Sequence, residues 1–464
     1  MASFTGKIVE GVAALDVAAA TDDDDEAAEK RVATKGPTQL QHSGKLDEGK
    51  LFRMLAGGRA ALQEERERKR TRDGHSFKFW DTQPVPKLTD ANVTEEGGAG
   101  QIDTEKQPAD VRQDPYPLPR GFEWVNIDTS NDVEMGEVYK LLTENYVEDD
   151  DNMFRFDYSI AFLRWGLTPP GFFPDWHVGV RQTSNKRLRA FITGIPAQIR
   201  VFDNSKKMCE INFLCVHKKL RGKRLSPVLI KEITRRVNLR NIWQAVYTAG
   251  VVLPRPVARC QYWHRSINPK KLVSVGFSRL APRMTMKRTI RLYKLPEKPA
   301  TGGIRAMEQR DVPGVQKLLS GYLRRFSLAP AFSVEEVAHM LLPRDKVITS
   351  FVVEHPTEAG VITDFCSFYH LPSSIIGNAE YKTLFAAYSY YNVATSVPLD
   401  QLISDLLVLA RDLKFDVFNI LDVMDNETIL KTLKFGPGDG HLQYYLYNWR
   451  CMDVKPNECG LVLL

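Results

Sequence analysis

The stretch EINFLCVHKKLRGKRLSPVLIKEITRR, from Glu210 to Arg236, decides the fold of this chain. Its first part alternates apolar side chains between two faces, as a buried strand does, and its last part repeats them at helical spacing. Ser226 is a residue type that caps helices, and Pro227 fits a first helical position, where no backbone donor is needed. The stretch therefore predicts a strand, a basic turn and a helix.

The basic turn lies where the predicted helix begins. Arg221, Lys223 and Arg224 surround that helix N-terminus, whose free N–H groups and dipole favour anions. This spacing fits a phosphate-binding cradle at the end of an apolar strand. A solvated basic loop fits it equally well.

Two motifs of the chain resemble the signatures of one family. EINFLCVHK at 210–218 matches the first signature of N-myristoyltransferases, and KFGPGDG at 434–440 matches the second, in the same order. The turn LRGKRLSPVLI is also similar to the CoA-pyrophosphate turn of GNAT acyltransferases, with Arg224 where those usually carry a small residue. The similarity extends from about Phe77 to Leu464.

The resemblance implies an acyltransferase. It would transfer myristoyl from its co-substrate myristoyl-CoA to the N-terminal glycine amine of peptides and nascent proteins, without a metal. A GNAT-type acetyltransferase acting on lysine or amines is the alternative enzyme. A non-catalytic acyl-CoA-binding protein and an RNA-binding module are the alternatives without catalysis; the latter would use Arg235, Arg236 and Arg240, which the helical pattern places on a solvated face.

Composition and cysteine usage indicate the class of protein. With 464 residues and 43% hydrophobic content the chain can build a large core, and a dispersed net charge of +6 does not indicate specific DNA binding. Six cysteines without paired spacing favour reduced thiols and a cytoplasmic protein. No apolar stretch is long enough for a transmembrane segment, and no spacing of His, Cys, Asp and Glu suggests a metal.

The chain divides into three regions. Residues 1–75 segregate their charges and contain few apolar residues, which predicts a disordered tail. Its basic block fits either a plain solvated tail or docking on ribosomal RNA, and the resemblance associates this region with the translation machinery. The resemblance implies that residues 76–295 form an acyl-CoA-binding half and residues 296–464 a peptide-binding half that carries the C-terminal carboxylate.

Helix and strand patterns alternate in both halves and predict an α/β fold with a mixed sheet. The resemblance implies two GNAT-like halves, related by a pseudo-two-fold axis, that form one saddle-shaped sheet flanked by helices. The expected helices are 132–145, 227–240, 312–326, 334–342 and 398–414, and the expected strands are 187–195, 209–216, 347–354, 361–369, 416–421 and 442–449.

The resemblance assigns the acyl donor to two segments. The implied acyl-CoA-binding residues are Lys78, Phe79, Trp80, Phe213, Leu214, Cys215, Val216, Arg221, Gly222, Lys223, Arg224, Leu225 and Ser226. The main-chain amides of Phe213 and Leu214 would bind the oxyanion, which requires a bulge that frees them from the sheet. From the residues alone, FKFW is a packing anchor, Phe213 and Leu214 are core residues, and Cys215 is an inert buried thiol rather than a nucleophile.

The chain ends in the apolar segment CGLVLL. Such a segment is usually a frayed tail, yet burial would give its terminal carboxylate a need for a partner. An incoming ammonium group would be one. The resemblance implies that the carboxylate of Leu464 is the catalytic base, with Asn212 and Thr248 near the acceptor amine.

Further residues are expected to bind the peptide. By resemblance they are Tyr146, Asp149, Phe154, Phe156, Tyr158, Tyr262, His264, Ser389 and Asp439. The acidic run at 148–151 fits a solvated loop as well, the histidine fits a structural role, and GPGDG fits a tight glycine turn before a strand.

Overall fold

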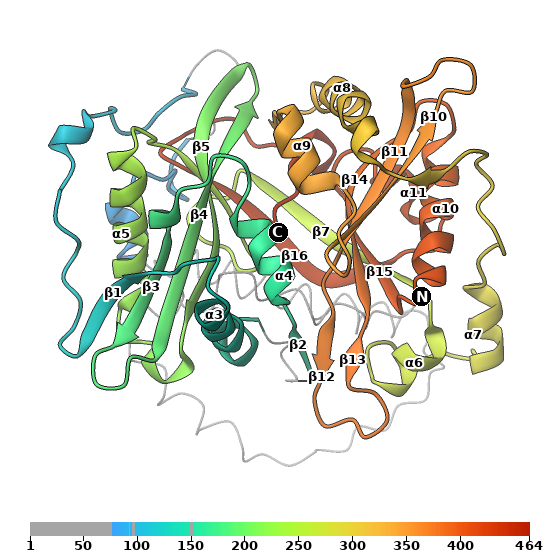
Figure 1. Ribbon diagram of the computed structural model, residues 1–464, viewed down its shortest axis with the longest axis horizontal. Helices are drawn as coiled ribbons and strands as arrows, with labels where there is room; N and C mark the ends of the chain where they lie inside the picture. The colour runs from blue at the N-terminus through green and yellow to red at the C-terminus, as the bar shows by residue number, and fades with distance from the viewer. Residues whose placement is uncertain (1–76, 92, 95–97, 148–152) are drawn as a thin grey trace, which may run out of the picture.

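The computed structural model describes residues 77–91, 93–94, 98–147 and 153–464. The predicted tail and Asp149 lie outside them. The described chain folds around one long mixed sheet with helices packed on it (Figure 1). In the first half the elements are β1 Phe122–Asn126, α3 Asp132–Asn145, β2 Phe154–Phe156, α4 Ile160–Leu167, β3 His177–Gln182, β4 Leu188–Val201, β5 Asn204–Val216, α5 Leu225–Leu239, β6 Ala245–Ala249, β7 Ala258–Ser266, α6 Pro269–Ser274 and α7 Met286–Leu292.

The second half repeats a similar order of elements. They are β8 Arg305–Ala306, α8 Val312–Leu323, β9 Leu328–Pro330, α9 Val334–Leu341, β10 Ile348–Glu354, β11 Ile362–His370, β12 Ser373–Ile375, β13 Thr383–Leu384, β14 Ala386–Val393, α10 Leu399–Asp412, β15 Val417–Leu421, α11 Glu427–Leu430 and β16 Gly436–Tyr447. Each predicted helix and strand has a counterpart here, with ends that differ by a few residues.

The order of strands in the sheet is nearly symmetric about its centre. It runs β1-β3-β4-β5-β6-β16-β7-β15-β14-β11-β10-β8. The pairs β5–β6 and β14–β15 are parallel, at matching places on the two sides. Strand β16 from the end of the chain lies between β6 and β7, and β7 pairs with β15, so each half completes the sheet of the other. The predicted mixed sheet flanked by helices is confirmed, whereas the division at residue 295 stays a prediction.

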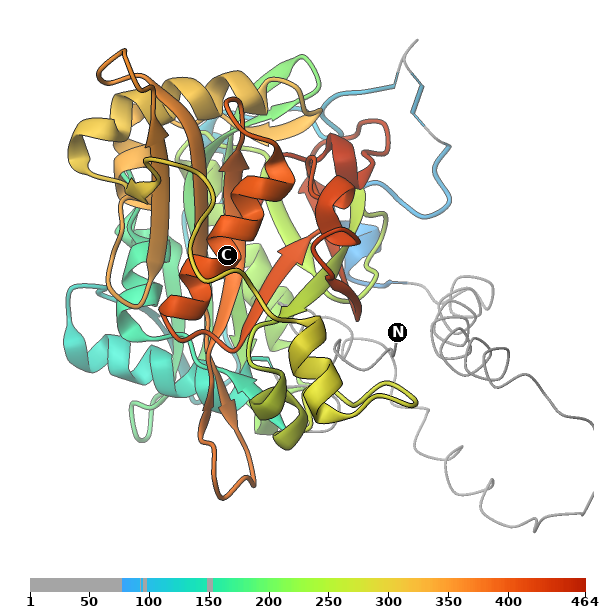
Figure 2. The ribbon, with the colours of Figure 1, turned by 90° about the vertical axis from the view of Figure 1, so that its right-hand side faces the viewer.

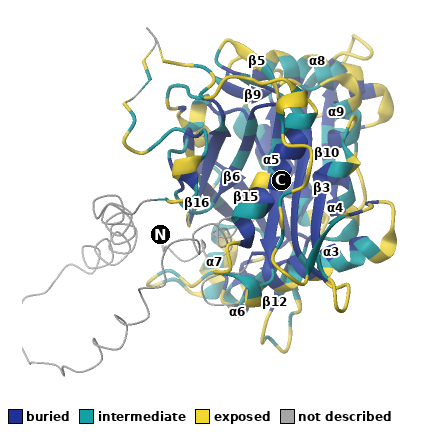
Figure 3. Cartoon of the chain, turned by 90° about the vertical axis from the view of Figure 1, so that its left-hand side faces the viewer, coloured by how far each residue is buried: buried dark blue, intermediate teal, exposed yellow. Residues whose placement is uncertain are grey.

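Helices cover both faces of the sheet. On the first half, α5 packs with the core around Ile192 and Leu214, whereas α3 and α4 pack with the core around Phe191 and Phe213. On the second half, α10 lies along β11 and β14 (Figure 2). The strands between these layers are the most deeply buried elements (Figure 3).

The start of α5 differs from the prediction. The helix begins at Leu225, and its N-cap is Arg224, which has a left-handed backbone with φ of +57° and no capping side chain. Ser226 is buried inside the first turn instead of capping it. Pro227 is tolerated at the third helical position because the N–H groups of the first turn have no intrahelical partner.

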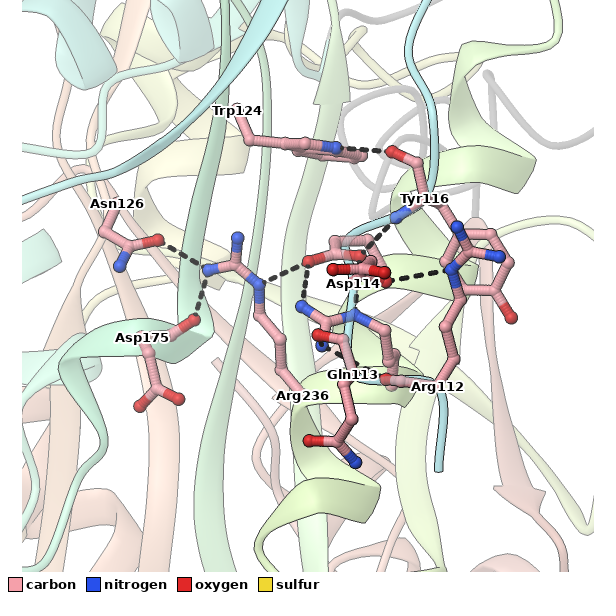
Figure 4. A network of polar contacts seen from close by, with 10 residues as sticks. Arg112, Gln113, Asp114, Tyr116, Trp124, Asn126, Asp175 and Arg236 are labelled. Carbon is pink, nitrogen blue, oxygen red and sulfur yellow. Dashed lines mark hydrogen bonds and ion pairs between the residues drawn. The ribbon is translucent and has the colours of Figure 1, made fainter. Parts of the chain in front are cut away.

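The arginines of α5 are also placed differently from the prediction. Arg235 and Arg236 are buried, and both donate to the fully buried carboxylate of Glu232 (Figure 4). Arg236 also donates to the carbonyl of Asp175, and Arg235 donates to carbonyls of the segment before β1. Only Arg240 keeps an exposed position, in a 3.2 Å ion pair with Asp175. The buried carboxylate of Glu232 needs paired donors, and Arg235 and Arg236 supply them. The same two arginines also hold neighbouring segments against the helix.

Candidate active site

A β-bulge interrupts the pairing of β4 with β5. Phe191 pairs with Cys215 and Thr193 with Asn212, so Phe213 and Leu214 lie together opposite Ile192. The N–H of Phe213 donates to the side-chain oxygen of Asn212, at 2.9 Å, rather than to β4. The bulge that an oxyanion site requires is therefore present at these two amides.

Phe213 holds a strained backbone at the bulge. Its φ is +53°, a left-handed value that costs a bulky residue about 1–2 kcal/mol. Its ring is 1% exposed and packs at centroid distances of 5.3 Å from Tyr158 and 5.9 Å from Tyr146. This packing stabilises the strained conformation and fixes the direction of the bulge amides.

An apolar cavity of about 730 Å³, measured out to its open mouth, lies between β5, β6 and α5. Trp80 stacks on Tyr247 at 5.8 Å and closes one side, so the FKFW segment both anchors the chain and lines the cavity. The almost wholly apolar lining suits a hydrocarbon group. The lining residues are Trp80, Ile192, Ile211, Asn212, Leu214, Ile230, Ile233, Thr234, Val237, Asn238, Trp243, Gln244, Ala245, Tyr247, Thr248, Ala249, Leu253 and Tyr447.

The C-terminal segment is packed into the protein near α4 (Figure 1). The carbonyl of Leu461 accepts from the hydroxyl of Tyr444, and the N–H of Val462 donates to Tyr391. Gly166 of α4 leaves room for Leu464, since a Cβ there would lie 3.1 Å from the leucine side chain. The tail is thus an ordered part of the core and not a frayed end.

Asn212 joins the bulge to the C-terminus. Its amide nitrogen donates to the terminal oxygen of Leu464 at 2.5 Å, while its oxygen accepts from Phe213. Asn212 and Thr248 both line the cavity, on the neighbouring parallel strands β5 and β6. The structure therefore brings the predicted residues Asn212, Phe213 and Leu464 into contact, and Asn212, Leu214 and Thr248 line the apolar cavity.

Aromatic rings lead away from the bulge. Phe156 lies 5.8 Å from Tyr158 and 6.2 Å from Tyr388, which in turn lies 6.2 Å from Tyr262. Phe154 forms a separate pair with Phe277 at 5.9 Å. Four of the predicted peptide-binding rings, those of Tyr146, Phe156, Tyr158 and Tyr262, are thus connected through ring contacts that include Phe213 and Tyr388, and Tyr388 was not among the predicted residues.

His264 lies against the second signature motif. Its Nδ1 is 2.6 Å from the side-chain oxygen of Asn419, and burial lowers the pKa of His264 to about 4, against the opposing effect of this hydrogen bond. A Cβ on Gly438 would lie 2.4 Å from His264 Nε2, so only glycine allows this approach. Because β16 already begins at Gly436, with a register shift between Pro437 and His441, the motif is an irregular start of the strand and not a tight turn before it.

The remaining predicted residues spread around this centre. Asp439 is exposed, and the buried hydroxyl of Ser389 accepts from Asn392 at 2.8 Å. Cys215 and Val216 are buried at the end of β5, with the thiol of Cys215 directed at the carbonyl of Leu141.

The basic turn is exposed at Gly222, Lys223 and Arg224, whereas Leu225 and Ser226 are buried. Arg221 donates to the carbonyl of Asn145 and thereby ties the turn to α3. Lys78 is exposed beside the half-buried Phe79, at the edge of the aromatic anchor.

The sequence did not predict several residues that line or support the site. Trp243 and Tyr247 line the apolar cavity, and Asn419 holds His264. Their only signal was the aromatic content of the segment before and within β6, which equally fits a packed core. Among the described residues no group of His, Cys, Asp and Glu is placed to hold a metal ion. Within those residues no helix has both the length and the apolar character that crossing a membrane requires.

Comparisons with known proteins agree with this geometry. The family model "Myristoyl-CoA:protein N-myristoyltransferase, N-terminal domain" matches residues 101–260, and the model of the C-terminal domain matches residues 274–462. Glycylpeptide N-tetradecanoyltransferase 1 of Arabidopsis thaliana is 58% identical over 393 residues, which cover 84% of this chain and 90% of the relative. Glycylpeptide N-tetradecanoyltransferase 2 of Bos taurus is 58% identical over 389 residues, which cover 84% and 76%.

A solved structure is similar as well. The crystal structure of Saccharomyces cerevisiae N-myristoyltransferase with bound myristoyl-CoA is 42% identical, covers 83% of this chain and 99% of its own, and superposes with a TM-score of 0.80. On these matches to both domains and over most of its length, the chain belongs to the myristoyl-CoA:protein N-myristoyltransferase family.

Proposed function

We propose that this chain transfers the myristoyl group of myristoyl-CoA to the N-terminal glycine amine of peptides and proteins. The observation that carries the proposal is the double contact of Asn212, which links the bulge amide to the terminal oxygen of Leu464 at the end of an apolar cavity. The names of the relatives, which are glycylpeptide N-tetradecanoyltransferases, support it.

The apolar cavity would hold the acyl chain. At about 0.8 kcal/mol per buried methylene, a dozen methylenes contribute roughly 10 kcal/mol of binding. The exposed Lys223 and Arg224, together with the free N–H groups at the start of α5, would bind the phosphates of CoA. Side chains from β5, β6 and α5 line this cavity with apolar groups, which suits a long acyl chain and favours the myristoyl donor over the acetyl donor of the alternative enzyme.

The bulge would stabilise the transition state. In the proposed geometry the thioester oxygen lies at the amides of Phe213 and Leu214, and it shares the Phe213 donor with Asn212. Preorganised donors of this kind act where negative charge develops, and losing one typically costs about 2.7–4 kcal/mol.

The terminal carboxylate of Leu464 would act as the base. It accepts a proton from the incoming ammonium group, while Asn212 and Thr248 position the carboxylate and the amine. The free amine then attacks the thioester carbon directly, the C–S bond breaks, and the CoA sulfur leaves with the second amine proton. The connected aromatic rings, with His264 and Asp439, would hold the following residues of the peptide, and a first residue larger than glycine would collide with the thioester.

We also propose a cellular setting for this reaction. Its acceptors would include nascent proteins, which places the chain in the cytoplasm. Residues 1–75, outside the described residues, would then contact the ribosome.

One assay tests the proposal. The protein is mixed with myristoyl-CoA and a glycine-starting peptide, and the peptide mass is followed beside an alanine-starting control. We expect a myristoyl mass gain with glycine alone. No gain with glycine, or an equal gain with both peptides, would refute the proposal, and acetylation of a lysine peptide from acetyl-CoA would favour the alternative enzyme.

A further inference from the structure

A second carboxyl group lies on the strand that carries the bulge. Glu210 precedes Asn212 by two residues on β5, and residues two apart share one face of a strand. It is paired with Ile195 of β4 and with Val246 of the parallel strand β6. Its side chain therefore points to the face on which Asn212 meets the C-terminus.

Among the described residues, the carboxyl group of Glu210 has no partner of opposite charge. Within the described part of the chain it makes no ion pair and no side-chain hydrogen bond, although the residue is only half exposed. The titratable groups whose electrostatics Glu210 influences are Cys209, Tyr390 and Tyr391, whereas the terminal oxygen of Leu464 is contacted by Asn212 on the same face of β5. Burial raises the pKa of Glu210 to about 7. An uncompensated acid of this kind is costly to a fold and is often found at functional sites.

Tyr391 connects Glu210 to the C-terminal segment. Its hydroxyl accepts from the N–H of Val462 at 3.2 Å. Burial raises the pKa of Tyr391, the Val462 amide opposes this shift, and the charge of Glu210 adds to it. This hydroxyl therefore holds the tail two residues before Leu464, and its electrostatic environment includes the charge of Glu210.

The proposed base has a thermodynamic weakness. An α-amino group has an ordinary pKa of about 7.7–8.0 and a C-terminal carboxyl group one of about 3.3–3.7. Transfer of a proton from the first to the second is unfavourable by about four orders of magnitude. A proton acceptor works best when its pKa lies near the working pH, which the environment of Glu210 provides and an ordinary C-terminus does not.

We propose that Glu210 is the group that takes up the proton removed from the acceptor amine by the carboxylate of Leu464. The inference rests on the proposed function and deepens it. The first proton passes from the ammonium nitrogen to the Leu464 oxygen, then to Glu210 and finally to water. The second leaves the nitrogen when the C–S bond breaks and goes to the CoA sulfur, so that the reaction releases one proton in all. Glu210 acts through Leu464 and is a positioning residue for the proton.

The test compares Glu210→Gln with the whole wild-type protein between pH 6 and pH 9. We expect kcat to fall about 100-fold, the lower end of the contribution of a positioned proton acceptor. The peptide KM and the affinity for myristoyl-CoA should stay within twofold, and the rise of kcat around pH 7 should disappear. Glu123→Gln is the matched control, because it removes a strand glutamate that pairs with Lys186 on the surface, and it should behave as wild type.

Thermal unfolding separates this role from a structural one. The raised pKa of Glu210 means that the unfolded chain ionises at a lower pH than the folded protein, so stability falls as pH rises from about 4.5 to about 7. Glu210→Gln should therefore unfold at a higher temperature than wild type at pH 8 and at the same temperature at pH 4. A glutamate that merely supports the fold would lose stability on replacement, and that result would overturn the proposal.

A second variant keeps the test decisive if Glu210→Gln does not fold. Glu210→Asp retains an acid on a shorter side chain, and it should recover at least tenfold of the lost kcat and show a pH limb moved from that of wild type. Wild-type kcat and pH profile in both variants would overturn the inference while leaving the proposed function intact. An inactive wild-type protein would instead remove the proposed function itself.

Discussion

The two parallel strand pairs of the sheet, β5–β6 and β14–β15, have the same topology, but an open cavity lies beside the first and a filled core beside the second. Both are preceded by a bulged strand pair: Phe213 and Leu214 lie opposite Ile192 in the first half, and Tyr390 and Tyr391 lie opposite Ser367 in the second. Beside β5 and β6 there is an apolar cavity of about 730 Å³. Beside β14 and β15 the space is filled by rings, among them Phe368, Phe415 and Phe418.

The two bulges differ in the same way. In the first half Phe213 has positive φ, and its N–H donates to Asn212, which also reaches the C-terminus. In the second half no residue from Ser389 to Asn392 has positive φ, and the N–H of Tyr391 donates to the buried hydroxyl of Ser367. The bulge of the first half thus contains a residue with positive φ and borders an open cavity. The bulge of the second half has neither feature and is packed into the core.

The largest expected effect comes from removing the C-terminal segment, which belongs to the second half and contacts Asn212 in the first. Removal of Leu461–Leu464 should lower turnover about 1,000-fold, because the proposed base is lost while the cavity in the first half remains. Turnover and myristoyl-CoA affinity are measured on the same preparation. Retained turnover would show that the carboxylate is not the base.

A large side chain in the cavity beside β5 and β6 should make this region resemble the filled core beside β14 and β15. Ala245→Phe places a ring in the cavity and displaces about four methylenes, which weakens myristoyl-CoA binding about 200-fold at about 0.8 kcal/mol each. Calorimetric titration with myristoyl-CoA and shorter acyl-CoAs measures this, and the shorter chains should lose less. Ala387→Phe on β14 is the matched control: it should lower stability by about 1–3 kcal/mol and leave donor affinity unchanged. Equal donor loss in both variants would contradict the assignment.

The bulge donors offer a comparison of matched hydrogen bonds. Asn212→Ala removes the contacts to Phe213 and Leu464 and should lower kcat about 100-fold with little change in donor affinity. Ser367→Ala removes the corresponding contact to Tyr391 and should cost about 1–3 kcal/mol of stability without a change in kcat. Steady-state kinetics and denaturant unfolding check both, and a similar loss of kcat in the two variants would make the bulges equivalent.

The smallest effect is expected at the basic turn. Replacing Lys223 and Arg224 by Ala should weaken CoA binding about fivefold to tenfold, because exposed charges contribute at most about 1 kcal/mol each. The loss should shrink as salt is raised. Lys287 and Arg288 on α7 are equally exposed, and their replacement should leave the affinity unchanged. Unchanged affinity in the first variant would argue against a phosphate cradle.

Local patterns of the sequence predicted most of the fold. Alternating and helical apolar spacing identified β5 and α5, because burial of one face imposes that spacing. The predicted start of α5 was wrong because an arginine in the sequence gives no indication that its backbone will be left-handed, as it is at Arg224. Arg235 and Arg236 were misplaced because their partner, Glu232, is itself hidden on the helical face that binds the segment before β1.

The candidate site depended on long-range contacts. Composition and spacing suggested the phosphate cradle, but they gave no reason to place Leu464 beside Asn212, 252 positions earlier in the chain. That contact forms only when the sheet has brought the two halves together. Trp243 and Tyr247 were missed for a related reason, since an aromatic residue that lines a cavity and one that fills a core look alike until the neighbouring strands are in place.

The exchange of β16 and β7 has a consequence for synthesis. β6 and β7 are complete at Ser266, yet the strand that pairs with both begins only at Gly436. At 5–20 residues per second, roughly 10 to 35 s pass before that strand leaves the ribosome. During this interval β6 lacks its partner on one edge and β7 lacks both of its partners, β15 and β16, and such unpaired edges are templates for aggregation. Until β16 is synthesised, these edges therefore carry an aggregation risk that the finished sheet removes.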